Sequence, residues 1–188
     1  MSFARVRALV VVGVLTVAAV VFVVVALFRD TQRDLASGGC PAGAPLADIR
    51  LPNDPAKVTI KVFNGTKRAD LAEQVSNEFA NRRFVVQEVG KTKTKVEGVA
   101  EIRYGPDTVG KAHLLQAYFL AHSTMVYNAK REGDVVDIII GDKFQALATT
   151  TEVNQSLGAE GEPTLPPGAC VKPAEKPAEE PSEPETRQ

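Results

Sequence analysis

The sequence predicts an α+β protein with three parts: one transmembrane helix, a small domain and a disordered tail. In the domain, elements in the order β-α-β-β-α-β-β would place the helices on one face of a mixed sheet. Three observations lead to this prediction: an uncharged apolar run near the N-terminus, alternating strand-like and helix-like periodicities in the middle, and a Pro/Glu-rich end. The expected boundaries are a cytoplasmic N-terminus at 1–7, the transmembrane helix at 8–28, a linker at 29–56, the domain at 57–153 and the tail at 154–188.

The apolar run extends from Ala8 to Phe28, 21 residues without a charge. At ~1.5 Å per residue it spans about 30 Å, the thickness of the hydrocarbon core of a bilayer. A cleaved signal peptide would have a shorter apolar segment that ends at small residues. A lipoprotein signal would have to use Cys40, twelve residues beyond Phe28. We therefore expect a retained anchor, with the chain held at the membrane.

After a linker broken by Gly and Pro, the domain begins with a strand, because apolar and polar residues alternate from Val58 to Val62. Apolar residues then recur at helical spacing, which predicts a helix over 69–81. A second strand is expected at 84–89, followed by a polar connection at 91–95. A third strand is expected at 99–104.

Gly105-Pro106 ends the third strand, and Asp107 or Thr108 can cap a second helix. The closing strands are expected at 125–127 and 135–140. The last run is apolar except for Asp137, which suits a strand buried in the centre of the sheet.

Two cysteines, Cys40 and Cys170, flank the predicted domain. A disulfide between them would close the domain at both ends and would stabilise it by about 4–5 kcal/mol in the loop-entropy model. Two unrelated thiols are the alternative, and no metal site is expected because no His lies near either Cys. Because disulfides persist outside the cytoplasm, the pair favours an extracytoplasmic domain on a single-pass membrane protein.

Composition and motifs argue against catalysis. The net charge of −1 disfavours nucleic acid as a partner. His113 and His122 both fall in the second expected helix, where a spacing of nine residues points them in opposite directions. The chain lacks a P-loop, an H-E-x-x-H pair and a G-x-S-x-G motif. We therefore expect a protein that is not an enzyme and needs no cofactor or metal.

One turn could bind an anion. After the first strand the chain reads Asn64, Gly65, Thr66, Lys67 and Arg68, directly before the first helix. Free N–H groups at a helix start and two cations favour a phosphate group. The alternative is that Asn-Gly only turns the chain and that water solvates the cations. The alternate lysines at positions 91, 93 and 95 are open to the same two interpretations.

Several motifs together resemble the LytR C-terminal domain family. They are V-x-N-G-T at 62–66 before a helix that begins near Ala69-Asp70-Leu71-Ala72, Phe84-Val85-Val86 after an Arg where the family often has Gly, Ile102-Arg103-Tyr104-Gly105, Ala112-x-x-Leu115 in the second helix, and the closing strand with Gly141-Asp142 at 135–142. The resemblance covers about 57–144. It implies a module of cell-envelope proteins similar to those of actinobacteria, with no catalytic residue to carry over, and it assigns Asn64-Gly65 to turn geometry.

We expect a membrane-anchored extracytoplasmic binding or scaffolding protein that supports envelope integrity. Its partner would be a cell-envelope protein, a wall glycopolymer or a lipid. The alternative is an accessory protein that holds a phosphorylated polyprenyl or glycopolymer headgroup at Asn64–Arg68 during wall polymer assembly. An uncharacterised hydrolase or transferase is a third hypothesis.

Overall fold

The computed structural model describes residues 13, 16 and 40–173, and the chain divides into two units, 1–42 and 43–188. In the first unit, Gly13 and Thr16 have helical backbone. The predicted N-terminus, transmembrane helix and most of the linker, like the tail from residue 174, lie outside the described residues. Within the described part of the chain, no helix is both long and apolar enough to cross a membrane.

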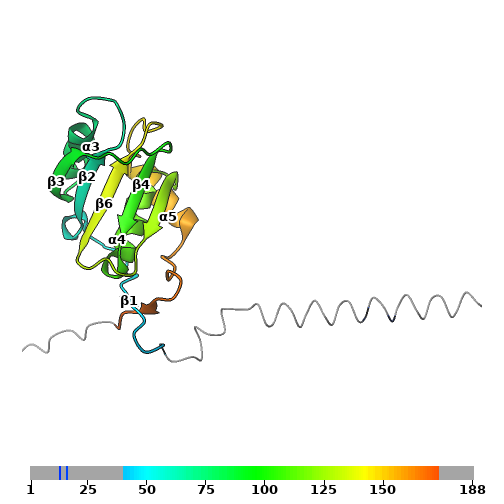
Figure 1. Cartoon of the computed structure of the whole chain (residues 1–188). Helices are drawn as coiled ribbons and strands as arrows, with labels where there is room; N and C mark the ends of the chain where they lie inside the picture. The colour runs from blue at the N-terminus through cyan, green and yellow to red at the C-terminus, as the bar shows by residue number, and fades with distance from the viewer. Residues whose placement is uncertain (1–12, 14–15, 17–39, 174–188) are drawn as a thin grey trace, which may run out of the picture. The chain divides into compact units, whose positions relative to one another are not determined.

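The second unit is built on a five-stranded mixed sheet with the order β3-β2-β6-β4-β5 (Figure 1). Strand β2 pairs in parallel with β3 and β6, β4 pairs in parallel with β5, and only the β4–β6 pair is antiparallel. The strands are β2 (Thr59–Asn64), β3 (Val85–Lys91), β4 (Ala100–Tyr104), β5 (Ser123–Tyr127) and β6 (Val135–Ile140). The prediction of an α+β fold with a mixed sheet is therefore confirmed.

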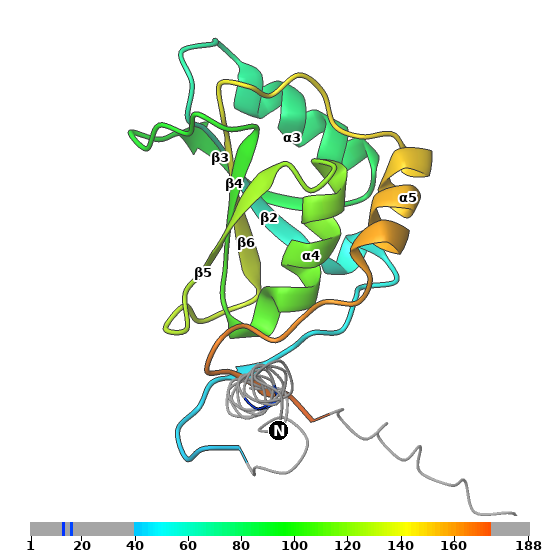
Figure 2. The same ribbon diagram turned by 90° about the vertical axis from the view of Figure 1, so that its right-hand side faces the viewer.

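Two helices connect the parallel pairs and cover the same face of the sheet. Helix α3 (Leu71–Asn81) joins β2 to β3, and α4 (Val109–Tyr118) joins β4 to β5. Figure 2 shows both on one side of the sheet, with α5 beyond α4. Their apolar residues meet the alternate residues of β2, β4 and β6 in one core, in which Phe79 contacts Phe84, Tyr118 and Phe119.

The central position of β6 follows from its sequence. Val136, Ile138 and Ile140 belong to the core under the helices. Ile139 points to the other face and is nevertheless only 1% exposed. On that face, the connection from β3 to β4 passes the end of the sheet, where Val96 is buried beside Gly141. A strand covered on both faces needs the near-continuous apolar run that predicted it.

Helix α3 begins two residues later than predicted, at Leu71 instead of residue 69. Asp70 has a φ of 54°, in the left-handed region, so the helix cannot include it. The side-chain amide of Asn64 donates to the carbonyl of Arg68 over 2.6 Å and thereby keeps residues 65–70 in a loop.

The sequence missed three elements of the second unit: β1 (Leu46–Ala47), α5 (Thr150–Glu160) and β7 (Cys170–Val171). Helix α5 extends beyond residue 153, where the domain was expected to end, and the described residues continue to 173. Thr149 and Glu152 form a capping box that starts α5, and Val153 and Leu157 pack against the core. The sequence contains the capping residues Thr149 and Glu152. However, α5 buries only one apolar residue, so the helical periodicity of its apolar residues is weak.

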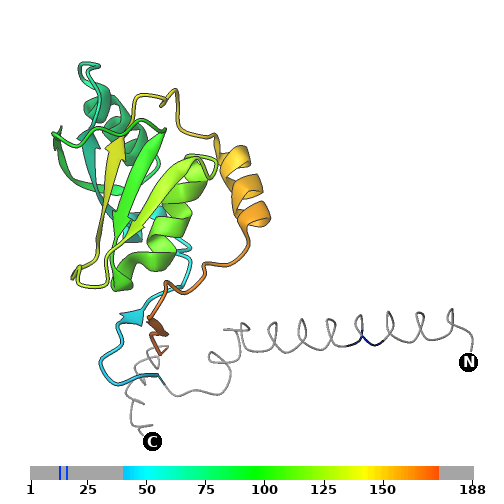
Figure 3. The same cartoon turned by 45° about the vertical axis from the view of Figure 1, so that its right-hand side comes forward.

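The chain enters and leaves the second unit side by side. Strands β1 and β7 pair in parallel, with Leu46 opposite Cys170 (Figures 1 and 3). Strand β1 packs on the β4–α4 connection, where the N–H of Asp48 donates to the carbonyl of Pro106. Both cysteines are disulfide-bonded. Since the sequence has only two, the bond joins Cys40 to Cys170, as predicted.

Candidate functional site

The end of the sheet away from β1 and β7, here called the distal end, carries the features singled out in the sequence. Asn64 pairs with both Lys91 and Ile140 at the ends of their strands, and Ala100 pairs with Ile140 and Ser123. The loops that leave or enter these strands therefore meet at one place, at the top of Figure 1. They are residues 65–70, 92–99, 119–122 and 141–147.

The predicted Asn64–Arg68 turn is held by its own side chains. Asn64 is 2% exposed, and its side-chain oxygen accepts from the N–H and the hydroxyl of Thr66, both over 2.9 Å. The hydroxyl of Thr66 in turn accepts from the N–H of Arg68 over 3.0 Å. Two of the backbone donors that an anion could use are thus occupied within the turn, which favours a structural role for Asn64 and Thr66.

The turn has no space for a side chain at Gly65. A Cβ on Gly65 would lie 2.9 Å from Ile139 Cγ2, from the carbonyl of Ile140 and from the carbonyl of Thr94. The three contacts come from β6 and from the 92–99 loop, so both press directly on the turn. A close approach of backbone to backbone of this kind is possible only without a side chain.

Arg68 braces a second loop. Its guanidinium donates to the carbonyl of Phe144 over 2.8 Å, which ties the turn to the 141–147 loop. Arg68, one of the two cations predicted to face an anion, is therefore hydrogen-bonded within the domain. Lys67 is exposed and has no partner among the described residues.

The fold brings a second set of cations beside this turn. The N–H of Thr92 donates to the carbonyl of Asn64 over 3.2 Å, so the loop that follows β3 starts at the turn. Lys91 at the end of β3 and Lys93 and Lys95 in this loop are exposed, as is Lys143 in the 141–147 loop. Two cationic segments that lie about 25 residues apart in the sequence thus share one end of the domain.

Ion pairing separates this end from the remainder of the domain. Away from this end, three of the five described lysines are paired with carboxylates: Lys61 with Glu88, Lys111 with Asp134 and Lys172 with Asp107. Among the described residues, the lysines that lack an ion pair are Lys57, Lys67, Lys91, Lys93, Lys95, Lys130 and Lys143. All but Lys57 and Lys130 lie at the distal end. The exposed Asp70, Glu97 and Asp142 reduce the net positive charge there but form no ion pair with a described residue.

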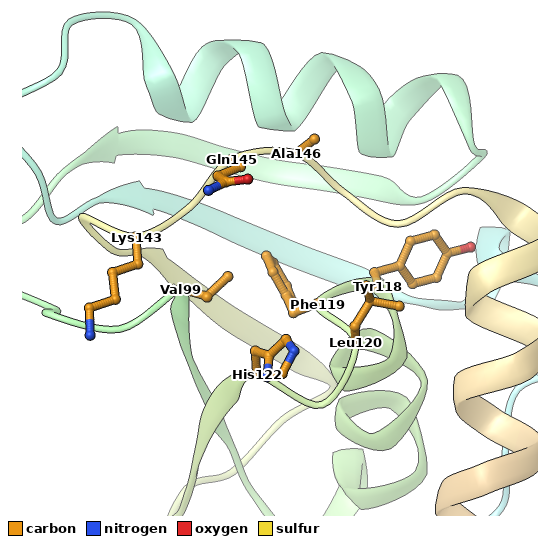
Figure 4. A pocket seen from close by; sticks show the side chains of 8 residues that line it. All are labelled: Val99, Tyr118, Phe119, Leu120, His122, Lys143, Gln145 and Ala146. Carbon is orange, nitrogen blue, oxygen red and sulfur yellow. The ribbon is translucent and has the colours of Figure 1, made fainter.

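A hollow of about 260 Å³ is lined by one of these cations, Lys143. Figure 4 shows Phe119 and Val99 at its centre, His122 on one side and Gln145 with Ala146 on the other, while Lys143 extends outward from the rim. Its lining combines apolar side chains with one lysine and one imidazole. This chemistry suits a ligand that has both an apolar and an anionic part.

The wall of the hollow contains an unusual turn. Leu120 and Ala121 have φ values of 51° and 59°, in the left-handed region that disfavours side chains. The turn ends α4 at Tyr118, so His122 lies outside the helix, contrary to the prediction. His113 remains in α4, where its imidazole contacts the carbonyl of Gly161 at 3.0 Å. Strained backbone of this kind concentrates at binding sites.

No metal centre is formed by the described residues, since no three His, Cys, Asp or Glu side chains in them lie close enough to share an ion. The burial of two tyrosine hydroxyls, those of Tyr104 and Tyr118, raises their pKa values, but both rings belong to the core. Neither contributes to the distal end as an acid or a base.

Comparison with known proteins identifies the domain. Residues 57–144 match the sequence model of a family described as LytR cell envelope-related transcriptional attenuator. This part of the chain is therefore similar to that family. The match confirms the resemblance drawn from the sequence and runs from the start of the LytR-type domain to Phe144, which accepts the hydrogen bond from Arg68.

The chain is also similar to a solved structure. It is the crystal structure of the soluble domain of a conserved hypothetical secreted protein, an Rv2700 ortholog from Mycobacterium marinum. The two share 20% sequence identity, the alignment covers 65% of this chain and 83% of the other, and the TM-score is 0.47. No curated protein matches the chain.

Proposed function

We propose that the protein is a membrane-anchored, non-enzymatic scaffold outside the cytoplasm, whose distal end binds an anionic polymer of the cell envelope. Residues 8–28 are its anchor in this proposal. The disulfide between Cys40 and Cys170 supports an oxidising location for the domain. The similarity of residues 57–144 to an envelope-related family supports an envelope partner.

The observation that carries the proposal is the concentration of unpaired lysines at the distal end. Five exposed lysines lie there, namely Lys67, Lys91, Lys93, Lys95 and Lys143, and none of them forms an ion pair with a described acid. Several flexible cations suit a repeating anion such as a phosphate-bearing glycopolymer, because each ammonium can contact a different charge along the chain. The stalk of β1 and β7 lies at the opposite end, which leaves the lysines accessible.

The experiment uses the full-length chain in detergent or lipid nanodiscs, with fluorescent inorganic polyphosphate as a defined anionic polymer and dextran as a neutral one. We expect polyphosphate to bind, and we expect its affinity to fall as salt rises, since salt screens exposed charges. Replacing Lys91, Lys93 and Lys95 together by Gln should weaken binding by tenfold or more. The matched control is Lys57→Gln with Lys130→Gln, two unpaired lysines away from the distal end.

The proposal fails if the control variant loses as much affinity as the triple variant, or if dextran binds equally well. The first result would show a general charge effect, and the second would show that the anionic groups are not recognised.

The hollow favours a second candidate, the binding of a phosphorylated polyprenyl or glycolipid headgroup. Its apolar wall would contact the first isoprene units, and Lys67 and Lys143 would face the phosphate. A short-chain prenyl phosphate should then bind more tightly than inorganic phosphate. The substitution Leu120→Asp, at an exposed apolar position of the wall, should remove that preference without affecting polyphosphate binding. Equal affinity for both phosphates would exclude this candidate.

A further inference from the structure

One face of the five-stranded sheet is left open. Helices α3, α4 and α5 all lie on the other face (Figure 2), and no α-helix of the described residues covers this one. The open face is formed by the residues of each strand that point away from the helices. Several of them are charged, so their arrangement determines which partner can bind the face.

Four charged residues of alternating sign stand opposite one another across this face. Lys61 of β2 is in register with Glu88 of β3 on one side and with Asp137 of β6 on the other. Asp137 is in turn opposite Arg103 of β4. We call these four residues the charge row: across the sheet it reads minus, plus, minus, plus. It ends at the uncharged Val126 of β5.

An irregularity in β3 supplies the first charge of the row. The pairing of β2 with β3 shifts register between Ile60 and Lys61. Glu88 therefore lies opposite Lys61, a position that the uncharged Gln87 would take without the extra residue. Bulges re-aim side chains in this way and are frequent beside functional surfaces. The alternation of four charges thus depends on the bulge.

The charges on the open face balance one another and remain partly exposed. Two neighbouring charges complete three ion pairs with the row: Lys61 with Glu88, Asp137 with Arg131, and Arg103 with Glu101. The six side chains are 19–51% exposed. Carboxylates and guanidinium groups can each bind more than one partner. A face whose charges sum to zero does not attract a uniformly charged polymer or lipid surface, but it suits a partner whose charges alternate.

We propose that the open face binds the same face of a second copy of this chain. The two-fold axis lies parallel to the strands, midway between β2 and β6. Rotation about this axis reverses the charge row, so that Glu88 of each copy faces Arg103 of the other. Lys61 of each copy likewise faces Asp137 of the other. A two-fold interface of this kind is self-complementary, since each contact occurs twice.

Other positions of the axis bring like charges together. An axis parallel to the charge row would place every charge opposite its own copy. An axis on β6 would place Asp137 opposite Asp137 and Lys61 opposite Arg103. Like charges across an interface disfavour the complex. The charge row therefore favours one arrangement of the two copies.

The uncharged neighbours of the row fit the same arrangement. Thr59 and Val135 are opposite each other on the stalk side of the row, and both are half-buried. The rotation brings Thr59 of one copy opposite Val135 of the other, so two β-branched side chains meet. On the distal side, Ile139 is already covered. The contact is therefore centred on the charge row and extends toward the stalk.

The axis also sets the direction of the stalks. Rotation about an axis parallel to the strands leaves the strand direction unchanged, so β1 and β7 of both copies lie at the same end of the dimer. Two chains anchored in one membrane need this orientation, a step that rests on the proposed function. Anchoring would then raise the effective concentration of one face toward the other.

The test exchanges charges between copies of the full-length chain in detergent. Each copy carries a donor or an acceptor dye at Val171, an exposed residue of the stalk. Light scattering measures the mass, and energy transfer reports how close the stalks are. We expect the wild type to form a dimer with high energy transfer.

The variants Glu88→Lys and Arg103→Glu should each weaken the dimer by about tenfold or more, because like charges then meet at both ends of the row. An equal mixture of the two variants should restore the dimer, since the new lysine of one faces the new glutamate of the other. This restoration would also show that both variants are folded. Glu78→Lys makes the same change of charge on the exposed side of α3, and as the control it should leave the dimer unchanged.

Four results would overturn the inference. They are a wild type that stays monomeric at all concentrations, a dimer that Glu88→Lys leaves intact, a mixture that fails to restore the dimer, and a dimer with low energy transfer, whose stalks would lie at opposite ends. A monomeric wild type would leave the face to a different protein with alternating charges. Both row variants should bind polyphosphate as the wild type does, and the detergent removes the membrane, so a failure here is distinguishable from a failure of the proposed function.

Discussion

The two ends of the LytR-type domain differ in how their charged side chains are paired. Near the stalk, carboxylates and cations are matched, as in Asp48 with Arg50 and Asp107 with Lys172. At the distal end the lysines are unpaired, and the polar groups that are bonded, those of Asn64, Thr66 and Arg68, hold the backbone of the loops. The comparison indicates that one end is organised to close the fold and that the other leaves its cations available to a ligand.

The largest expected effect is the loss of the disulfide at the stalk. Replacing Cys40 and Cys170 together by Ser removes the closure of a loop of roughly 130 residues, which would destabilise the domain by as much as about 4–5 kcal/mol in the loop-entropy model. Thermal melting of the full chain should show a lower Tm for the variant and the same Tm shift for the wild type in reductant. An unchanged Tm would mean that the β1–β7 pairing alone closes the domain.

The next effect concerns the packing of the stalk on α4. A Cβ on Gly110 would lie 2.0 Å from the carbonyl oxygen of Arg50, so Gly110→Ala should displace β1 and cost about 1–3 kcal/mol. Gly65→Ala at the distal end meets contacts of 2.9 Å and should cost less. Gly98→Ala, with no atom within 4 Å, is the control and should leave the denaturation midpoint unchanged. If Gly65→Ala were the least stable of the three variants, the comparison between the two ends of the domain would be contradicted.

An effect of similar size, but confined to one part of the domain, is expected at the turn. Asn64→Ala removes three hydrogen bonds from a buried position and should cost about 1–3 kcal/mol, since the partners are left unsatisfied. Hydrogen exchange should show faster exchange in 65–70 and 92–95, while the amides of β4 keep their protection. Lys67→Gln, in the same turn but exposed, should change neither exchange nor stability. Uniform loss of protection would instead assign Asn64 to the global fold.

The smallest effect is the pH dependence of the stalk. A hydrogen bond from Arg50 holds the pKa of Asp48 below its ordinary value of 3.8, and a hydrogen bond to Asp107 raises the pKa of Lys172 above 10.5. A lowered pKa stabilises the fold above 3.8, and this contribution is lost as pH falls through the folded value. A raised pKa stabilises below 10.5 and is lost as pH rises through the folded value. These two groups therefore contribute no change in Tm between these limits.

The variants separate the two limits. Asp48→Asn should reduce the acid decline of Tm, and Lys172→Gln should reduce the alkaline decline. Lys143→Gln, at the distal end, should alter neither. A change in the profile for Lys143→Gln would show that the distal lysines take part in folding.

Sequence reasoning located most of the sheet and helices because their apolar periodicities are strong. The apolar run of β6 indicated a central strand, and β6 lies third of five in the sheet. The order of the strands could not be obtained in this way, because periodicity reports which face of a strand is buried but not its neighbours. The short strands β1 and β7 were missed because two residues leave no period.

The candidate site shows the same limit. The sequence singled out Lys67 with Arg68 and, separately, the lysines of 91–95, and left each open between a binding role and simple solvation. Only the fold shows that Arg68 is used to hold the 141–147 loop and that the other lysines adjoin the same turn. The hollow was not foreseen, because Val99, Phe119 and Lys143 come from three separate loops.

By itself, the sequence determined the local features of this protein: the spacing of apolar residues, the Asn-Gly turn and the cysteines that flank the domain. These depend on neighbouring residues and on backbone preferences that are independent of the remainder of the chain. The tertiary structure decided which charges are paired, which strands become edges and which loops meet, because those properties depend on contacts between residues far apart in sequence. The distal lysines and the charge row across the sheet are both results of that second kind.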